Sequence, residues 1–333
     1  MFQPGIARRP FTGLLVAAAL GTVALAASSS AHAQAAAAPG SLRFVVPFPA
    51  GGTADVLPRI LSEKLRDRFP GGVVVENRAG AGGNIGAETV FRSAPDGSVL
   101  MASPPGPIAI NHNLYPKLGF DPTKWVPVTV MASVPNVLAV RTGLPVNTVQ
   151  EFVAYVKANA GKVSYASQGS GSTSHLTANM FMSLVGGEML HVPYKGTAPA
   201  LVDLMGGQVD VFFDNLGSAL AQHRAGKIRI LAVADEQRAA ALPGVPTFVE
   251  SGLKDMVAVT WFAVVAPPDT PAAIVQVRHA ALAEALAQPD VRQKFLDQGA
   301  EPRGWSPEQT GQFIRAETAK WQRVIRTANV KVD

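Results

Sequence analysis

Residues 42–55, with the sequence LRFVVPFPAGGTAD, decide how the chain begins to fold. Four of the first five residues are apolar, and Phe44, Val45 and Val46 are typical of a strand. A helix is expected over 55–69, with four apolar residues on one face: Val56, Ile60, Leu61 and Leu65. Glycines between a strand and a helix let the backbone approach a ligand, and the free N–H groups at the helix start favour an anion. The stretch therefore predicts a strand–loop–helix unit with an anion site, and a plain turn capped by Thr53 or Asp55 is the alternative.

The alternation of strands and helices continues along the chain. A second unit opens after 141–145 with a helix whose capping box, Thr148 and Glu151, satisfies two N–H groups at its start. The other expected strands are 73–75, 98–102, 162–166, 189–193, 209–213, 227–233 and 257–266; the other expected helices are 85–92, 174–185, 198–205, 217–225, 271–287, 289–298 and one from Ser306-Pro307 onward. This order predicts an α/β fold of parallel sheets with ligand loops at the carboxyl ends of the strands.

The helical tail predicts the domain organisation. The helices after residue 271 have to pack on a sheet, and if they return to the first unit, the chain crosses twice between two lobes, near 139–145 and 258–265. Two crossing strands make a hinge. We therefore expect lobe 1 to comprise 42–141 with 263–333, and lobe 2 to comprise 142–262.

Residues 1–33 have the features of a secretory signal peptide. Arg8 and Arg9 form a charged start, 14–27 is apolar, and Ala31-His32-Ala33 has the form of a cleavage site. The apolar run is shorter than the roughly 20 residues that a membrane-spanning helix needs. We expect export to the periplasm with cleavage near Ala33, by the general or the twin-arginine route, and a disordered leader over 34–41.

Composition limits the classes of function. The sequence of 333 residues contains no cysteine, which excludes disulfides, thiolate chemistry and cysteine-ligated metals. Loss of Arg8 and Arg9 with the signal lowers the formal net charge from +5 to +3, because residues 1–33 contain no acidic residue. This mild charge, without runs of Lys or Arg, indicates no nucleic-acid partner.

Two further glycine-rich loops follow strands. The segment NRAGAGGNIG (77–86) resembles a dinucleotide fingerprint, but Ile85 stands where G-x-G-x-x-G, counted from Gly80, needs a glycine. The segment SQGSGSTSH (167–175) offers hydroxyl and N–H donors at another helix start. A nucleophile elbow needs G-x-S-x-G, which neither Ser170 nor Ser172 has. The loops therefore favour binding of an anion.

Side chains beside these loops are further candidates. The histidines of the mature chain form no spaced metal pair, so neither a metal nor a cofactor is expected, and a structural role is favoured for His175 at its helix start. Tyr194 and Lys195 follow one strand and Asp214 closes another, so all three fall at the carboxyl ends of the second sheet. Asp214 would accept a hydrogen bond from a ligand there; a solvated loop position is the alternative, above all for Lys195.

Taken in order, these segments resemble the Bug receptors of the tripartite tricarboxylate transporter family. The matching segments are VPFPAGGTAD (46–55), ENRAGAGGNIGAE (76–88), SQGSGSTSHL (167–176), VPYKGTAPALVDLMGGQVDVFFDN (192–215) and WFAVVAPPDTP (261–271). The resemblance implies a type II periplasmic binding protein, in which two Rossmann-like lobes on a two-strand hinge hold a carboxylate by backbone amides, hydroxyls and water. The ligand contacts that it implies are Phe48, Ala50, Thr53, Asp55, Gly82, Asn84, Ser167, Gly169, Ser170, Thr173, His175, Tyr194 and Asp214.

The residues and the resemblance together predict a monomeric receptor that is not an enzyme. It captures a small carboxylate by closing its lobes, in the manner of a Venus flytrap, and delivers the ligand to membrane transporter subunits or to a sensor. The alternative is an exported α/β hydrolase that uses Ser170 or Ser172 with His175, although these residues lie too close along one turn for the usual triad. A purely structural envelope protein would leave the three glycine-rich loops unexplained.

Overall fold

The computed structural model describes residues 40–327, 330 and 332. The predicted signal peptide and residues 34–39 of the predicted leader lie outside these residues. The described chain begins at Gly40, whose carbonyl accepts a hydrogen bond from the Gly71 N–H at 2.8 Å. Gly40 and Ser41 of the predicted leader are thus described, and this bond ties Gly40 to the turn at Gly71.

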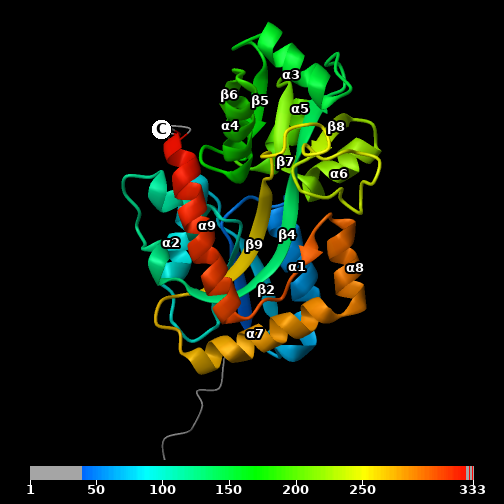
Figure 1. Ribbon diagram of the computed structural model, residues 1–333. Coiled ribbons are helices and arrows are strands. Elements are labelled where there is room, and N and C mark those ends of the chain that lie inside the picture. Colours follow the sequence, from blue (N-terminus) through cyan, green and yellow to red (C-terminus); the bar gives the residue numbers. More distant parts are fainter. Residues whose placement is uncertain (1–39, 328–329, 331, 333) are drawn as a thin grey trace, which may run out of the picture. The chain divides into compact units, whose positions relative to one another are not determined.

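The elements follow the predicted alternation (Figure 1). The strands are β1 (Leu42–Val46), β2 (Val73–Asn77), β3 (Val99–Ser103), β4 (Val126–Arg141), β5 (Ser164–Ser167), β6 (Leu190–Pro193), β7 (Val211–Asn215), β8 (Ile228–Val233), β9 (Val259–Ala266) and β10 (Glu301–Pro302). The α-helices are α1 (Thr53–Leu65), α2 (Asn84–Phe91), α3 (Val149–Ala158), α4 (Thr173–Val185), α5 (Thr197–Met205), α6 (Leu216–Arg224), α7 (Ala272–Ala287), α8 (Pro289–Asp297) and α9 (Pro307–Thr327). Short helical turns are η1 (Arg66–Arg68), η2 (Ala81–Gly83), η4 (Asn111–Asn113) and η5 (Pro122–Lys124), and a π-helical turn is η3 (Gly106–Ile110).

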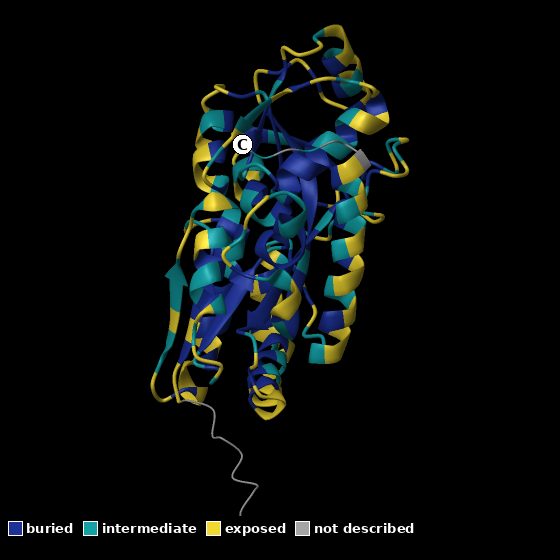
Figure 2. Cartoon of the chain, turned by 90° about the vertical axis from the view of Figure 1, so that its left-hand side faces the viewer, coloured by how far each residue is buried: buried dark blue, intermediate teal, exposed yellow. Residues whose placement is uncertain are grey.

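The first lobe is built on the parallel strands β2, β1 and β3, with β9 antiparallel beside β3. Successive side chains of a strand point to opposite faces. Phe44 of β1 accordingly packs with Leu57 of α1, whereas Val45 packs with Val90 of α2. Both faces of the sheet are therefore covered by helices, and Figure 2 shows the buried strands lying inside helices whose outer faces are exposed.

The long strand β4 was not predicted from the sequence, and neither was the two-residue strand β10. From Val126 to Pro135 it pairs with β9, and from Asn136 onward it pairs with β7 and β8. Its prolines and its polar residues conceal the strand pattern, because proline cannot donate to a sheet ladder. The change of partners at Pro135 falls several residues before the predicted crossing at 139–145. The return through Val259 lies within the predicted 258–265.

The second lobe has the same plan as the first. The parallel strands β6, β5 and β7 continue into the second half of β4, which is flanked on its other side by β8. Phe212 and Phe213 of β7 belong to two different buried clusters, so this sheet is also covered on both faces. Strands β4 and β9 run side by side from one lobe to the other, as Figure 1 shows. Whether residues 142–262 move as one body stays a prediction.

The C-terminal helices pack on the first lobe, which is the return that the element order predicts. The indole Nε1 of Trp261 in β9 donates to Glu317 of α9 at 2.9 Å. The Val130 N–H in β4 donates to the Thr310 hydroxyl of α9 at 3.1 Å. These two bonds fix α9 to both crossing strands.

The boundaries of α1 differ from the prediction. The helix runs from Thr53 to Leu65, and its sheet-facing row is Leu57, Leu61 and Leu65. Val56 and Ile60, expected on the buried face, are only partly buried. The sheet lies against the row spaced at i, i+4 and i+8, which the cluster of apolar residues in the sequence does not single out.

The predicted capping box forms only in part. The Thr148 hydroxyl accepts from the Glu151 N–H at 3.1 Å, but the Glu151 carboxylate accepts from the Asn147 N–H instead of that of Thr148. The reciprocal arrangement occurs at α9, where Ser306 and Gln309 each accept the backbone N–H of the other. Each arrangement satisfies two N–H groups that a helix start leaves without partners.

Candidate ligand-binding cleft

Three cavities lie between the loops of the first lobe and those of the second. The mouth cavity, of about 440 Å³, lies between 79–83 and 194–196; the α1 cavity and the α4 cavity, of about 20 Å³ each, lie deeper. Phe48 and Gln168 line all three. Because about 10–15 Å³ holds one water molecule, each small cavity accepts little more than that while the lobes are in this position.

The α1 cavity is formed where the starts of two helices face each other. It is lined by Gly52, Thr53 and Ala54 of the first lobe and by Gly196 and Thr197 of the second. Neither α1 nor α5 has a side-chain cap, and the first N–H groups of a helix have no acceptor within it. Donors from both lobes therefore meet at one place, where the helix dipoles favour an anion.

Thr53 lines this cavity, and its buried hydroxyl has no partner among the described residues. Thr53 is 3% exposed, and its Oγ1 makes no hydrogen bond with the described residues. A buried hydroxyl without a partner costs about 1–3 kcal/mol relative to a paired one. A ligand oxygen in the α1 cavity would remove that cost.

The α4 cavity is formed by the third glycine-rich loop. It is lined by 168–173, together with Gly82 and Asn111 of the first lobe. Asn111 donates to the Gly82 carbonyl at 3.0 Å and to Asn84 Oδ1 at 2.6 Å, which ties the second glycine loop to the segment after β3. The Ser172 hydroxyl donates to the Gly169 carbonyl at 2.7 Å, which holds the loop at the start of α4.

Asp55 holds the first loop in place. Its carboxylate accepts from the Gly51 N–H at 3.0 Å, from Arg59 at 2.9 Å and from Asn77 at 2.9 Å. Burial alone would raise the pKa of Asp55, but these three hydrogen bonds outweigh it and lower the pKa. The Asp55 carboxylate is thus ionised, and it accepts its hydrogen bonds from residues of the first lobe.

Asp214 lies beneath the cleft. It is 0% exposed, and its oxygens accept from Gln168 Nε2 at 2.9 Å and from the Ser218 hydroxyl at 2.6 Å. Burial raises the pKa of Asp214 to about 7, against the hydrogen bonds from Ser218, the Asn215 N–H and Gln168. Asp214 lines none of the three cavities, and its hydrogen bond from Gln168 connects it to a residue that lines all of them.

The histidine beside the serine loop is part of an aromatic stack. The ring of His175 lies 4.0 Å from that of His191 at an interplanar angle of 3°, and Tyr165 stacks on His191. The Nδ1 atom of His175 accepts from the Gly171 N–H at 3.1 Å. Burial, and next the neighbouring His191, lower the pKa of His175 to about 3. His175 is therefore neutral and shapes the loop, in agreement with the structural role favoured from its position.

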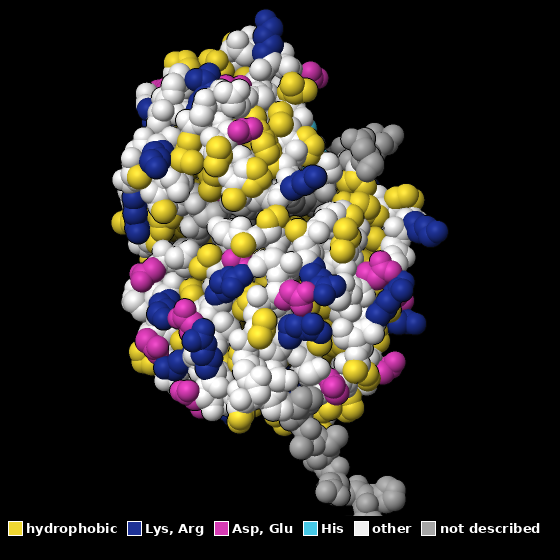
Figure 3. Space-filling view, turned by 180° about the vertical axis from the view of Figure 1, so that it is seen from behind, with side chains coloured by type: hydrophobic (Ala, Val, Ile, Leu, Met, Phe, Trp, Pro, Cys, Tyr) yellow, Lys and Arg dark blue, Asp and Glu magenta, His cyan; other side chains and the backbone are white. Residues whose placement is uncertain are grey.

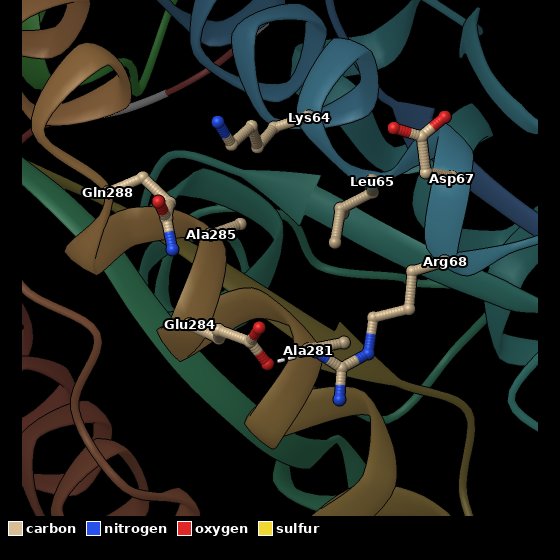
Figure 4. A pocket seen from close by; sticks show the side chains of 8 residues that line it. All are labelled: Lys64, Leu65, Asp67, Arg68, Ala281, Glu284, Ala285 and Gln288. Atoms are coloured by element: carbon tan, nitrogen blue, oxygen red, sulfur yellow. Dashed lines mark hydrogen bonds and ion pairs between the residues drawn. The ribbon is translucent and has the colours of Figure 1, made fainter.

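A separate cavity of about 360 Å³ lies between the end of α1 and α7, away from the cleft. Figure 4 shows Arg68 and Glu284 pointing toward each other across it, where they form an ion pair. Lys64 pairs with Asp290 at 3.1 Å nearby. Because its charged groups are exposed to water and Arg68 already pairs with Glu284, this cavity offers only weak interactions to a charged ligand.

The charges of the protein are mixed rather than segregated. On the face shown in Figure 3, basic and acidic side chains are interspersed. Among residues 40–327, no three His, Asp or Glu side chains are arranged to hold a metal ion. None of the helices described is both long and apolar enough to cross a bilayer.

Comparison with known families agrees with this geometry. The family described as "Tripartite tricarboxylate transporter family receptor" matches residues 57–330. The chain belongs to this family. Receptors of the family are periplasmic solute-binding proteins, and the predicted α/β binding-protein fold and the resemblance to Bug receptors are confirmed.

Three relatives of the receptor show how far the similarity extends. BugT of Bordetella pertussis is 37% identical over 293 residues, which cover 87% of this chain and 90% of BugT. The solved structure of R. palustris Rpa4515 with adipate is 37% identical, with a TM-score of 0.85 over 88% of this chain and 98% of that chain. MatC (Rpa3494) from Rhodopseudomonas palustris, with bound malate, is 32% identical, with a TM-score of 0.81 over 86% and 98%.

The structure divides the predicted contacts of the receptor into two groups. Those that line the cavities are Phe48, Thr53, Gly82, Gly169, Ser170, Thr173 and Tyr194. Those that support the loops from behind or stand outside the cavities are Ala50, Asp55, Asn84, Ser167, His175 and Asp214. Lys195, for which a solvated position was the alternative, lines the mouth cavity with an exposed side chain.

Several cavity residues were not identified from the sequence: Pro104, Asn111, Gln168, Thr197, Asn215 and Phe262. Gln168 and Asn215 lie within the quoted segments, but the prediction was based on the glycines and charged residues of those segments. Their position at the carboxyl ends of β5 and β7 was the signal that could have found them. Asn111 follows a π-helical turn, for which the sequence gives no pattern.

Proposed function

We propose that the receptor captures a small dicarboxylate between its lobes and delivers it to membrane transporter subunits. The observation that carries the proposal is the convergence of the starts of α1 and α5 on one cavity, which is lined by Thr53 with its unpaired hydroxyl. Neutral N–H donors at helix starts stabilise a carboxylate by about 0.3–2 kcal/mol each. No cation is needed, because charge-assisted hydrogen bonds to several donors suffice.

The presence of two small cavities that share lining residues supports a ligand with two acidic ends. The α1 cavity offers donors from α1 and α5, and the α4 cavity offers the loop at the start of α4. Phe48 and Gln168 lie between them and line both. One carboxylate in each cavity would engage both lobes at once, and the adipate and malate in the related structures are acids of this kind. Such a ligand favours the closed state because only that state presents both sets of donors.

The place of action follows from family and sequence. Receptors of this family are periplasmic, and residues 1–33 have the composition of a signal peptide. We propose cleavage near Ala33, after which the mature receptor meets its transporter subunits as a monomer. Intact mass of the periplasmic fraction tests this: a start near Gln34 is expected, and a chain that keeps Met1 in that fraction contradicts it.

Ligand capture is tested most directly with the freshly purified receptor. Native mass spectrometry is expected to detect a co-purified small acid, and calorimetry with a series of C4 to C6 dicarboxylates is expected to give saturable binding. The melting temperature should rise with ligand concentration, because a ligand that binds only the folded state stabilises it by mass action. Absence of binding by every acid of the series would overturn the proposal.

Replacement of Thr53 by valine separates binding from folding. Thr53→Val keeps the shape of the side chain and removes a buried hydroxyl that has no partner, so we expect the unliganded protein to be as stable as the wild type or slightly more stable. Dicarboxylate affinity should fall by about tenfold, since a bond to the ligand is lost. Calorimetry and denaturant titration measure the two quantities.

Thr129→Val is the matched control. Thr129 is equally buried, but its hydroxyl donates to the Trp305 carbonyl at 2.8 Å, far from the cavities. This variant should lose stability and keep its ligand affinity. The reverse pattern in the two variants would show that Thr53 does not face the ligand.

Among the described residues, neither Ser170 nor Ser172 forms a nucleophile–base pair with His175, as the hydrolase alternative requires. The Ser172 hydroxyl is directed at the Gly169 carbonyl, and the Nδ1 atom of His175 accepts a backbone N–H. Ser167 does contact a histidine, with its hydroxyl 2.6 Å from His191 Nε2, but Ser167 is 0% exposed. The receptor is expected to return dicarboxylates and simple esters unchanged. Turnover that is lost in Ser170→Ala would favour the enzyme.

A further inference from the structure

Gln168 occupies the centre of the cleft. It is the residue before the loop at the start of α4, and with Phe48 it lines the α1, α4 and mouth cavities. A side chain that separates two carboxylate positions faces the middle of a dicarboxylate, where such acids differ in their substituents. The direction of its amide therefore bears on selectivity.

Both amide hydrogens of Gln168 are used below the cleft. Nε2 donates to Asp214 Oδ1 at 2.9 Å and to Asn215 Oδ1 at 3.3 Å. An ionised carboxylate only accepts, so the NH₂ group has to face Asp214. The carbonyl oxygen Oε1 then points away from Asp214, and it accepts no hydrogen bond from the described residues.

A chain of hydrogen bonds fixes the direction of Asn215 as well. Asn215 Nδ2 donates to Asn136 Oδ1 at 2.7 Å, Asn136 Nδ2 donates to the Thr177 hydroxyl at 2.6 Å, and that hydroxyl donates to the Thr173 carbonyl at 2.7 Å. A backbone carbonyl can only accept, so each donor along the chain has one direction. Asn215 therefore presents its oxygen to Gln168, which agrees with the orientation set by Asp214.

We propose that Gln168 Oε1 is a fixed hydrogen-bond acceptor that selects dicarboxylates with a hydroxyl or ammonium group between their acidic ends over unsubstituted acids of the same length. This inference rests on the proposed capture of a dicarboxylate. A substituted acid gives Oε1 a donor, whereas an unsubstituted acid leaves the carbonyl dehydrated and unpaired. Sites built to pair with a ligand's polar group reject analogues that lack it.

The test compares acids that differ only in the substituent. Calorimetry at pH 8 would use three sets: succinate, malate and aspartate; glutarate, 2-hydroxyglutarate and glutamate; adipate, 2-hydroxyadipate and 2-aminoadipate, with both enantiomers of each substituted acid. Asp214 is ionised at this pH, because its pKa is about 7. In the set that binds best, a substituted acid is expected to bind at least about tenfold more tightly than the unsubstituted one.

Asp214→Asn is expected to weaken the preference. The amide of the new side chain can donate to Gln168 Oε1, whereas Asn215 Oδ1 still accepts from Nε2, so the Gln168 amide is held in one direction less firmly. Loss of the buried charge should raise the affinity of all the acids, and the ratio between substituted and unsubstituted acid should fall, because Oε1 faces the cleft in only part of the molecules. Gln168→Met, which has neither group, should bring the ratio near one.

Asp210→Asn is the control for loss of a carboxylate. Asp210 lies just before the opposite end of β7, where it pairs with Arg141 at 2.8 Å and with Ser164. This variant should keep the wild-type ratio. A ratio near one in the wild type, or the wild-type ratio in Gln168→Met, overturns the inference while leaving dicarboxylate capture intact.

A readout without ligand keeps the two proposals apart. In the wild type at pH 8, the side-chain NH₂ of Gln168, assigned by its loss in Gln168→Met, should exchange with solvent slowly, and in Asp214→Asn it should exchange at least about tenfold faster. Fast exchange in the wild type overturns the fixed orientation. If no acid of the three sets binds, dicarboxylate capture fails, and the selectivity fails with it even where exchange is slow.

Discussion

Asp214 lies in surroundings that ordinarily favour the neutral, protonated form of a carboxyl group. It is fully buried, and the side chains that contact it, Gln168 and Ser218, are neutral. The raised pKa, about 7 against the ordinary 3.8, means that the folded protein keeps a proton that the unfolded chain releases. The free energy of unfolding therefore falls as the pH rises from about 4 to about 7, and this contribution is constant above that range.

Asp214→Asn should remove this dependence on pH. The amide cannot ionise, so the stability of the variant relative to wild type should increase between pH 5 and pH 8, by at most about 3 kcal/mol, because only the range from pH 5 to about 7 contributes. Denaturant titrations at pH 5, 6, 7 and 8 measure it. Parallel curves for the two proteins would contradict the raised pKa.

Asp210 has a pKa shift of the opposite sign, so Asp210→Asn tests the opposite dependence of stability on pH. Burial would raise the pKa of Asp210, but hydrogen bonds from the Ser164 N–H, Arg141 and the Ser164 hydroxyl lower it. Its stabilisation is present above pH 3.8 and is lost as the pH falls below that value. The difference between this variant and the wild type should therefore be constant from pH 5 to pH 8.

The crossing strands are held together by a buried polar cluster. Asn136 of β4, which is 1% exposed, accepts from Asn215 Nδ2 and from the Thr260 hydroxyl of β9 at 3.0 Å, and it donates to Thr177 of α4. The Thr260 hydroxyl also lies 3.0 Å from that of Thr173 at the start of α4. The two strands that join the lobes are thus connected to the helix that forms the α4 cavity.

Asn136→Ala should be strongly destabilising. It leaves donors on Asn215 and Thr260 and an acceptor on Thr177 without their partner, so a loss of about 2–4 kcal/mol is expected. Asn179→Ala is the control, because Asn179 on α4 is half-buried and lies outside the cluster, where it bonds the His175 carbonyl of its own helix and the Tyr165 side chain. Chemical denaturation compares them, and equal losses would argue against the cluster.

The lobes of the receptor are in close contact across the cleft. A Cβ atom on Gly52, at the start of α1, would lie 3.2 Å from the Thr197 hydroxyl at the start of α5. The deep cavities of about 20 Å³ are too small for a dicarboxylate in this arrangement. We infer that the lobes separate to admit a ligand and close over it.

Gly52→Val should hinder closure without backbone strain, because Gly52 has φ of −91°. The added methyl groups press on Thr197 only when the lobes are closed, so the closed population and the affinity should fall together by about tenfold or more. Small-angle scattering should show the radius of gyration of the wild type decreasing on addition of ligand, with a smaller change in the variant. Gly244→Val, where nothing lies within 4 Å, is the control and should behave as the wild type does.

Local patterns in the sequence were sufficient for much of the fold. The apolar run at Leu42–Val46, the glycines before α1 and the Ser306-Pro307 helix start depend on neighbours a few residues away, which the sequence displays directly. The same holds for the position of the three ligand loops, because strand–loop–helix order places them at one edge of each sheet. Strand β4 was not predicted, because two prolines interrupt its strand pattern.

Which groups of those loops remain free was decided by tertiary structure alone. The Asp55 carboxylate accepts hydrogen bonds from Gly51, Arg59 and Asn77. The hydroxyl of Thr53, two residues earlier, has no hydrogen-bond partner among the described residues. Asp214 lies 46 residues from the Gln168 that it orients, and Asn136 lies 124 residues from Thr260. Hydrogen bonds are satisfied by whatever the fold brings within about 3 Å, so the sequence determined where the cleft lies, and only long-range packing determined which of its polar atoms remain free.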